Sequence, residues 1–245
     1  MIVGAAETTA YYHPTEFRVG RALSRAFGVL FGNVVTFVSI SALATLPTLF
    51  LALNTTINAT QNARLQIATS LTLTPLCEAM VLYATFQALR GRPVRAAESI
   101  GRGLRRFAPV FLATLLTSIV IVAGFFLVIV PGLIAAIVFS LTLPACVVER
   151  LDAVKSMKRS SALTRGYRWP IFGALFAVGL VSGVGEAAIE AATMHPATVL
   201  VYALLTFGWS TLGTAYQTVL TAIIYHDLRV VKEGIDLDRI AAVFD

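Results

Sequence analysis

One acidic residue stands inside a stretch that is otherwise apolar enough to cross a membrane. Glu78 lies in the segment 67–89, three residues after Pro75. An unpaired acid at the centre of a bilayer costs about 3 kcal/mol, so an ionisable residue at that depth is a functional hypothesis by default. Glu78 could bind a proton or a cation, or it could pair with hydroxyl groups of a neighbouring span. Of these we favour structural pairing, to which Pro75 adds a free backbone carbonyl.

A second group of polar residues lies in the C-terminal half of the chain. Glu186 and Glu190 are one helical turn apart, and His195 follows them. Paired carboxylates with a His can bind a metal or exchange protons. No complete motif accompanies them, so we interpret them as acids at the membrane interface and expect no metal, cofactor or catalytic residue. The candidate intramembrane polar site consists of Glu78, Glu186, Glu190 and, in the last apolar stretch, Gln217.

The elements that must position these residues are membrane spans. The chain has 245 residues, of which 57% are hydrophobic and only 13% are charged, whereas a soluble domain carries about 25% charged residues. No Lys, Arg, Asp or Glu occurs over 107–148, a run of 42 residues, and one span needs about 20 residues. The composition therefore predicts an integral membrane protein. Its N-terminal segment lacks the features of a cleaved signal peptide.

The apolar runs predict an all-α polytopic helix bundle that forms a single membrane domain with six transmembrane helices. Pro131 and Gly132 divide the long uncharged run into two spans joined by a tight turn, because Pro and Gly interrupt helices. Cys77 and Cys146 both fall within spans, so we expect no disulfide. The predicted spans cover 27–53, 67–89, 108–128, 131–148, 169–192 and 198–225, followed by a tail over 226–245.

The basic residues indicate how the spans are oriented. With six spans, 18 of the 19 Lys and Arg residues lie in tails and loops on one side of the membrane, and only Arg64 lies on the other. Lys and Arg in short loops favour the cytoplasmic side. The sequence thus predicts a multi-pass protein of the bacterial inner membrane with both termini in the cytoplasm. This arrangement accounts for the basic loops without nucleic-acid binding.

A basic segment with helical periodicity precedes the first, third and fifth spans. Apolar residues recur on one face of each segment, which is typical of amphipathic helices at a membrane surface. Three units, each a surface helix followed by two spans, suggest a three-fold repeat, although any Arg-rich loop between spans looks similar. The residues expected to contact anionic lipid headgroups are Arg21, Arg25, Arg102, Arg105, Arg106, Lys158, Arg159, Arg165 and Arg168.

Small residues recur at every fourth position in the fifth predicted span. Gly179, Gly183 and Ala187 form a stripe of the kind that lets helix backbones approach closely. Ser210 and Thr214 belong to a comparable stripe in the sixth span. We expect the two stripes to pack against each other or against a partner, either another membrane protein or a second copy of this chain.

The second half of the chain also resembles a known family. The run VPGLIAAIVFSLTLPACVVERLDAVKSMKRSSALTRGYRWPIFG and the later YHDLRVVKEGIDLD resemble YciC-like bacterial membrane proteins with six spans. They also resemble the membrane domain attached to some glycerophosphodiester phosphodiesterases. Matching features include the Pro-Gly pair, a Pro one turn before Val-Val-Glu, and Thr-Arg-Gly before an aromatic-Pro pair. The resemblance, clearest over 129–238, implies a fold and a membrane location, but no substrate.

Three functions are compatible with the sequence. The first, which we favour, is a non-catalytic membrane protein that organises or binds lipids or partner membrane proteins through its basic helices. The second is a small proton- or ion-coupled transporter that uses Glu78, with Pro47, Pro75 and Pro144 breaking helices around a binding site. The third is an intramembrane hydrolase, for which no nucleophile–base motif is evident. A water-accessible cavity that reaches Glu78 would favour the second function.

Overall fold

The chain folds into helices, and no strand occurs among the residues that the computed structural model describes, which are 17–54, 58–92, 94, 96–193 and 199–234. His195 and the predicted tail beyond Gly234 lie outside these residues. In chain order the helices are α1 (Val19–Gly32), α2 (Val34–Leu53), α3 (Ala59–Leu71), α4 (Leu73–Leu89), α5 (Ala96–Arg105), α6 (Phe107–Leu127), α7 (Ile129–Phe139), α8 (Thr142–Val148), α9 (Ala153–Thr164), α10 (Arg168–Ala192) and α11 (Val199–Glu233).

Six helical stretches of the described chain are long and apolar enough to cross a membrane, as predicted. They are Val34–Leu53, Ala59–Leu89, Phe107–Leu127, Ile129–Val148, Arg168–Ala192 and Val199–Glu233. The fold is therefore an all-α polytopic membrane bundle. A shorter helix precedes the first, third and fifth of these stretches, namely α1, α5 and α9. The same order of elements thus occurs three times, which is the order that the proposed repeat requires.

Several predicted span boundaries were wrong. The first span begins after Asn33, which separates α1 from α2, and not at residue 27. The second begins at Ala59 rather than at residue 67 and consists of two helices that meet at Thr72. The last continues to Glu233, where Gly234 adopts a positive φ of 59° and ends it. In each case helical hydrogen bonding begins or ends at a different residue from the apolar run.

The turn between the third and fourth spans also differs from the prediction. Val128 alone separates α6 from α7, and Pro131 lies in the first turn of α7, where a helix requires no backbone donor. The role of Gly132 is close packing. A Cβ added at Gly124 would lie 2.9 Å from the Cα of Gly132, so only glycine allows the two helices to approach this closely.

The fourth predicted span is interrupted between α7 and α8, and a serine of α9 supports the interruption. The Ser160 hydroxyl donates to the carbonyl of Val138 at 2.7 Å and accepts from the backbone N–H of Leu141 at 3.1 Å. Ser160 is fully buried, so both backbone groups are satisfied without water. The basic segment that contains α9 therefore packs into the bundle as well as carrying charge.

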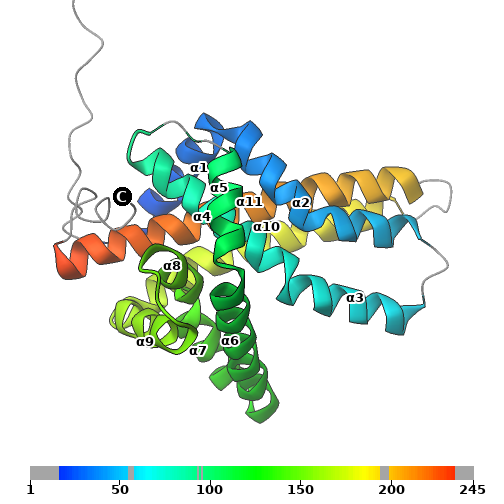
Figure 1. The fold of residues 1–245 in the computed structure, drawn as a ribbon. Helices are drawn as coiled ribbons and strands as arrows, with labels where there is room; N and C mark the ends of the chain where they lie inside the picture. The colour runs from blue at the N-terminus through cyan, green and yellow to red at the C-terminus, as the bar shows by residue number, and fades with distance from the viewer. Residues whose placement is uncertain (1–16, 55–57, 93, 95, 194–198, 235–245) are drawn as a thin grey trace, which may run out of the picture.

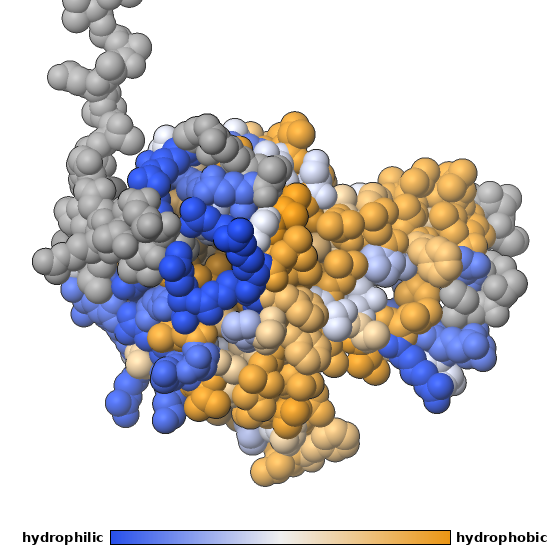
Figure 2. Space-filling view, in the orientation of Figure 1, coloured by the Kyte–Doolittle hydropathy of each residue, from blue (hydrophilic) through white to orange (hydrophobic). Residues whose placement is uncertain are grey.

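The helices form two arms that leave a common base (Figure 1). The four-helix arm contains α2, α3, α10 and the first part of α11, whereas the hairpin arm contains α6 and α7. The base, which we call the basic end, contains α1, α5, α8, α9 and the end of α11. Figure 2 shows hydrophilic residues over the basic end and hydrophobic residues over both arms, with a smaller hydrophilic patch at the outer end of α3.

An ion-pair network joins α9 to α11 at the basic end. Arg159 donates to Glu149 at 2.7 Å and pairs with Glu233, and Arg229 lies 3.4 Å from Glu233. Burial alone would lower the pKa of the Arg159 guanidinium, but hydrogen bonds and charge from Glu233 and Glu149 raise that pKa well above its ordinary value. Tyr225 also donates to Glu149. The charge of Arg159 is therefore compensated within the protein.

Candidate functional site: a polar cavity between apolar helices

Polar residues recur at every fourth position along α3 and α4. Asn62, Gln66, Ser70, Thr74 and Glu78 have the spacing of one helix face, and all five line cavities in the four-helix arm. At about 1.5 Å per residue, this stripe extends for about 24 Å. Its outer end is anchored by a capping box at the start of α3. The second span is weakly apolar because one of its faces is polar.

A matching stripe runs along α11. Tyr202, Thr206, Ser210, Thr214 and Gln217 are spaced by four, four, four and three residues, and they line the same cavities. The stripe extends for about 22 Å. The hydroxyl of Thr206 is buried and has no hydrogen-bond partner among the described residues. The stripe therefore includes a buried polar group that the described helices leave unsatisfied.

The remaining walls come from α2 and α10. Thr45 and Thr48 face the cavity from α2, next to Pro47, which interrupts the backbone hydrogen bonding of that helix. Glu186 lines the cavity from α10. A hydrogen bond of 2.6 Å between the hydroxyls of Thr45 and Thr211 fixes α2 against α11. Four helical walls thus present hydroxyl, amide and carboxylate groups to one space.

The space consists of two adjoining cavities. The outer one has a volume of about 670 Å³ and the inner one about 290 Å³. They share Thr74, Glu186, Ser210 and Thr214, so they form one polar tract. We call this tract the polar cavity. Ligand sites in proteins have volumes of about 300–1,000 Å³, so the polar cavity is large enough for a small solute.

The polar cavity contains acids but no base. Glu78 and Glu186 line its inner part, and no Lys, Arg or His occurs among the described residues that line it. In that part of the chain, neither carboxylate has a hydrogen-bond or ion-pair partner. At membrane depth, a carboxylate that has no cation partner is costly to keep charged. Binding a proton or a cation lowers this cost. The site can therefore bind protons or cations.

The structure brings together three of the four predicted polar residues. Glu78, Glu186 and Gln217 line the inner cavity, although they come from three different helices. Glu190 lies one turn beyond Glu186, is exposed, and is not among the lining residues. Within the described chain, Glu78 makes no hydrogen bond to a Ser, Thr or Tyr, so the structure does not show the structural pairing that we favoured from the sequence.

The predicted packing stripe of α10 does not contact α11. Cβ atoms added at Gly179 and Gly183 would meet nothing within 4 Å, and Ala187 is exposed. The contact uses the opposite side of α10, where a Cβ at Gly185 would lie 2.2 Å from the Trp209 ring. The bulky indole requires this glycine, and the small-residue spacing alone could not identify which face it would select.

The residues expected to contact lipid headgroups all lie at the basic end, in different surroundings. Arg105, Lys158, Arg165 and Arg168 are exposed, whereas the other five are partly buried. Among those five, Arg25 pairs with Asp227 at 2.9 Å, and Arg159 belongs to the network described above. Lipid contact remains a prediction for these residues.

Sequence reasoning missed most of the polar cavity. It identified Ser210 and Thr214 only as small residues for packing and did not note the spacing of Asn62, Gln66 and Thr206. The available signal was the recurrence of polar residues at intervals of four within two apolar segments. A polar face within an apolar helix is typical of helices that line a cavity.

Comparison with known proteins gives the family. A model of the domain of unknown function DUF7847 matches residues 94–228, which is more than half of the chain. The chain belongs to this family. The DUF7847 region covers α5 to α10 and the entire polar stripe of α11, whereas α1 to α4, including Glu78, precede it.

A curated relative supports the membrane assignment. UPF0259 membrane protein SG1383 of Sodalis glossinidius (strain morsitans) is 36% identical over 72 residues, which is 29% of this chain and 29% of the relative. This likeness supports a multi-pass protein of the YciC-like type. Neither match supports the predicted link to glycerophosphodiester phosphodiesterases, and neither indicates a catalytic family. No solved structure matches the chain.

Proposed function

We propose that the protein is a small membrane transporter whose polar cavity binds a cation, or a proton together with a polar solute, at Glu78 and Glu186. The observation that carries this proposal is the length of the polar stripe on α11, about 22 Å. The hydrocarbon core of a bilayer is about 30 Å thick. The polar stripe therefore accounts for most of the distance that a solute must cross.

The chemistry of the lining favours transport over the scaffold function that the sequence favoured. A scaffold needs no internal polar surface, and polar groups inside a bundle are costly unless they are paired. Here hydroxyl, amide and carboxylate groups from four helices converge on one space, and the carboxylates of Glu78 and Glu186 have no partner among the described residues. Pro47 in α2 and Pro75 in α4 interrupt two of these helices, as is common at transporter binding sites.

Tight packing ends the polar cavity toward the basic end. Beyond Gln217, residues Val219, Leu220, Ile223 and Ile224 of α11 are fully buried in the hydrophobic core. A solute in the cavity therefore reaches the basic end only if α11 and the neighbouring helices move apart. A site that is closed toward the basic end corresponds to one state of an alternating-access cycle.

Cysteine accessibility tests this proposal without knowledge of the solute. In a background with Cys77→Ala and Cys146→Ser, a Thr214→Cys variant is reconstituted in vesicles and treated from either side with a trimethylammonium thiosulfonate reagent. We expect reaction from both sides, because a transporter exposes its cavity alternately. The matched control is Leu212→Cys, since Leu212 is an exposed apolar residue of the same helix and should face lipid.

The charge of the reagent tests the role of the acid. The cationic reagent should react with Thr214→Cys faster than a sulfonate reagent does. Glu78→Gln should lower the ratio of these two rates roughly tenfold. Glu190→Gln, one turn outside the lining, should leave the preference unchanged. The transporter hypothesis fails if Thr214→Cys reacts no faster than Leu212→Cys, because the tract would then be closed to water.

A further inference from the structure

A separate cavity at the basic end is lined by arginines. It has a volume of about 420 Å³ and lies where α4 and α5 meet the start of α6 and the end of α8. The non-basic lining residues are Ala79, Tyr83, Gly103 and Val147, and no acid is found among the described residues of the lining. The four lining cations are Arg102, Arg105, Arg106 and Arg150.

The acids nearest to this cavity along the chain make ion pairs with Arg102 or with cations outside the lining. Glu98 lies 2.9 Å from Arg102 and accepts from the Tyr83 hydroxyl at 3.1 Å. Glu149, next to Arg150 in sequence, pairs with arginines of α9 and α11. Asp152 pairs with a lysine of α9 at 3.0 Å. The lining therefore carries more positive than negative charge.

The backbone at Arg150 gives a second, independent observation. Arg150 has a φ of 52° and is the only residue other than glycine with a positive φ in the described chain. It lies just beyond the end of α8, at the position where helices commonly carry glycine in this left-handed conformation. Any other side chain is strained there. An arginine at such a position is explained if its guanidinium is needed in the cavity.

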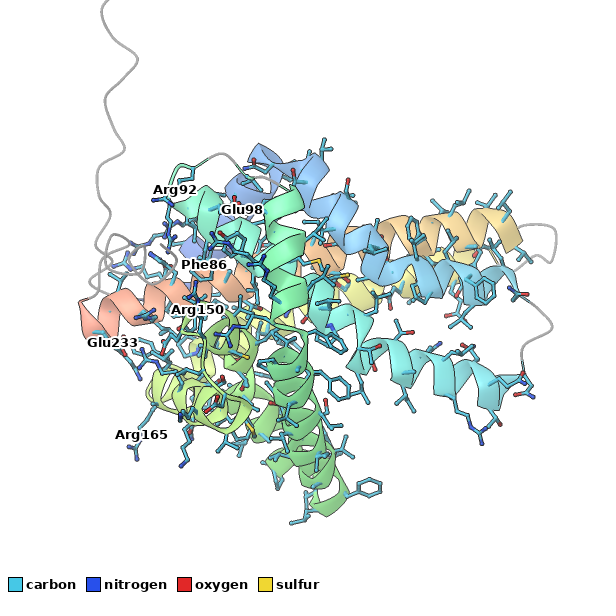
Figure 3. All side chains as sticks on the ribbon, in the orientation of Figure 1. Phe86, Arg92, Glu98, Arg150, Arg165 and Glu233 are labelled. Atoms are coloured by element: carbon cyan, nitrogen blue, oxygen red, sulfur yellow. The ribbon has the colours of Figure 1, made fainter. Side chains whose placement is uncertain are left out.

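The start of α6 adds to the positive potential. Arg105 and Arg106 immediately precede α6, and the Arg106 side chain makes no capping hydrogen bond to the helix. Unsatisfied N–H groups give the N-terminus of a helix a partial positive charge. Figure 3 shows that Arg165, another basic residue of this end, projects from the loop after α9 away from Arg150 and Glu98. Only some of the basic residues of this end therefore line the cavity, and the others can serve as controls.

We infer that this cavity binds a phosphate group, carried either by an anionic lipid or by a soluble phosphate ester. The guanidinium of arginine is planar and always charged, and it donates paired hydrogen bonds to phosphate oxygens. Ala79, Gly103 and Val147 give the cavity an apolar wall beside these donors, which suits the glycerol part of a headgroup. The inference is independent of the transport proposal, since none of these residues lines the polar cavity.

The variant Arg150→Gly tests the inference because it removes the cation, and glycine readily adopts the positive φ at this position. The full chain in neutral detergent is titrated with phosphatidylglycerol, and separately with glycerol phosphate, and binding is followed by native mass spectrometry. We expect one saturable anion site in the wild-type protein and roughly tenfold weaker binding in Arg150→Gly. The control is Arg168→Gln, an exposed cation outside the cavity, which should bind as the wild type does.

The two ligands distinguish the source of the phosphate. Saturable binding of phosphatidylglycerol alone, lost in Arg150→Gly, identifies a lipid headgroup site. Saturable binding of glycerol phosphate, lost in the same variant, identifies a site for soluble phosphate esters. The inference is overturned if neither ligand saturates, if Arg150→Gly binds like the wild type, or if Arg168→Gln weakens binding equally, because the attraction would then belong to the whole basic surface.

Discussion

The two arms of the molecule are both built from apolar helices, but their helices meet through different kinds of residue. In the hairpin arm, α6 and α7 approach through Gly124 and Gly132, so that the two backbones come into close contact. In the four-helix arm, stripes of hydroxyl, amide and carboxylate groups face one another across an open tract. Small residues let backbones touch, whereas facing polar residues leave a space that water or a solute can fill. Overall hydropathy does not distinguish these two outcomes.

The tips of the arms differ in the same way. The tip of the hairpin arm is apolar, with Phe126 at 85% and Leu127 at 75% exposure. The tip of the four-helix arm carries a polar capping box at Asn58, followed by Arg64. Exposed apolar residues of this size fit hydrocarbon, while Asn and Arg fit water or headgroups. We infer that the apolar tip contacts hydrocarbon, whereas the polar tip contacts headgroups or water.

The largest expected effect comes from placing a charge at each tip. Phe126→Arg should make the free energy of membrane insertion less favourable by up to about 3 kcal/mol, the cost of an arginine at the centre of the bilayer. Ala63→Arg, beside Arg64 in α3, should change it by less than about 0.5 kcal/mol. A glycosylation-based insertion assay measures both. Equal effects of the two substitutions would show that the tips share one environment.

An intermediate effect on stability is expected from the ion pairs that join α9 to α11. Helix α9 packs against the hairpin arm, and α11 belongs to the other arm. Arg159→Ala removes one of the two arginines that Glu149 and Glu233 share, and it leaves only Arg229. It should lower the free energy of unfolding by about 2 kcal/mol, since these groups are only partly buried. Lys158→Ala, an exposed neighbour, serves as the control and should be neutral. Thermal unfolding in detergent measures the difference, and equal melting temperatures would contradict a role for the network.

The smallest effect compares one hydroxyl in each arm. Thr45→Val removes the hydrogen bond to Thr211 in the four-helix arm and should cost about 0.6 kcal/mol, the usual size of such bonds in membrane proteins. In the hairpin arm, the buried Thr117 hydroxyl has no partner among the described residues, so Thr117→Val should be neutral or stabilising. Denaturant titration of both variants checks the sign. A larger loss for Thr117→Val would mean that the hairpin arm also depends on polar contacts.

The sequence by itself determined the all-α class, the six apolar stretches and the helices α1, α5 and α9 that precede three of them. These features depend on local sequence, because a run of apolar residues or a helical period is complete within a short segment. The local sequence also gave incorrect ends for some helices. It ended the last span at residue 225 although α11 continues to Glu233, and it assigned a turn to Pro131, which lies inside α7.

Only the tertiary structure decided which faces meet. Glu78, Glu186 and Gln217 are far apart in the sequence, and helix packing brings them to one cavity. It also placed Gly185 against Trp209, where the sequence indicated Gly179 and Gly183. The rotation of a helix about its axis depends on the shapes of all its neighbours, and no segment encodes those shapes alone. The sequence therefore determined that helices cross the membrane, and the packing determined where a polar site lies between them.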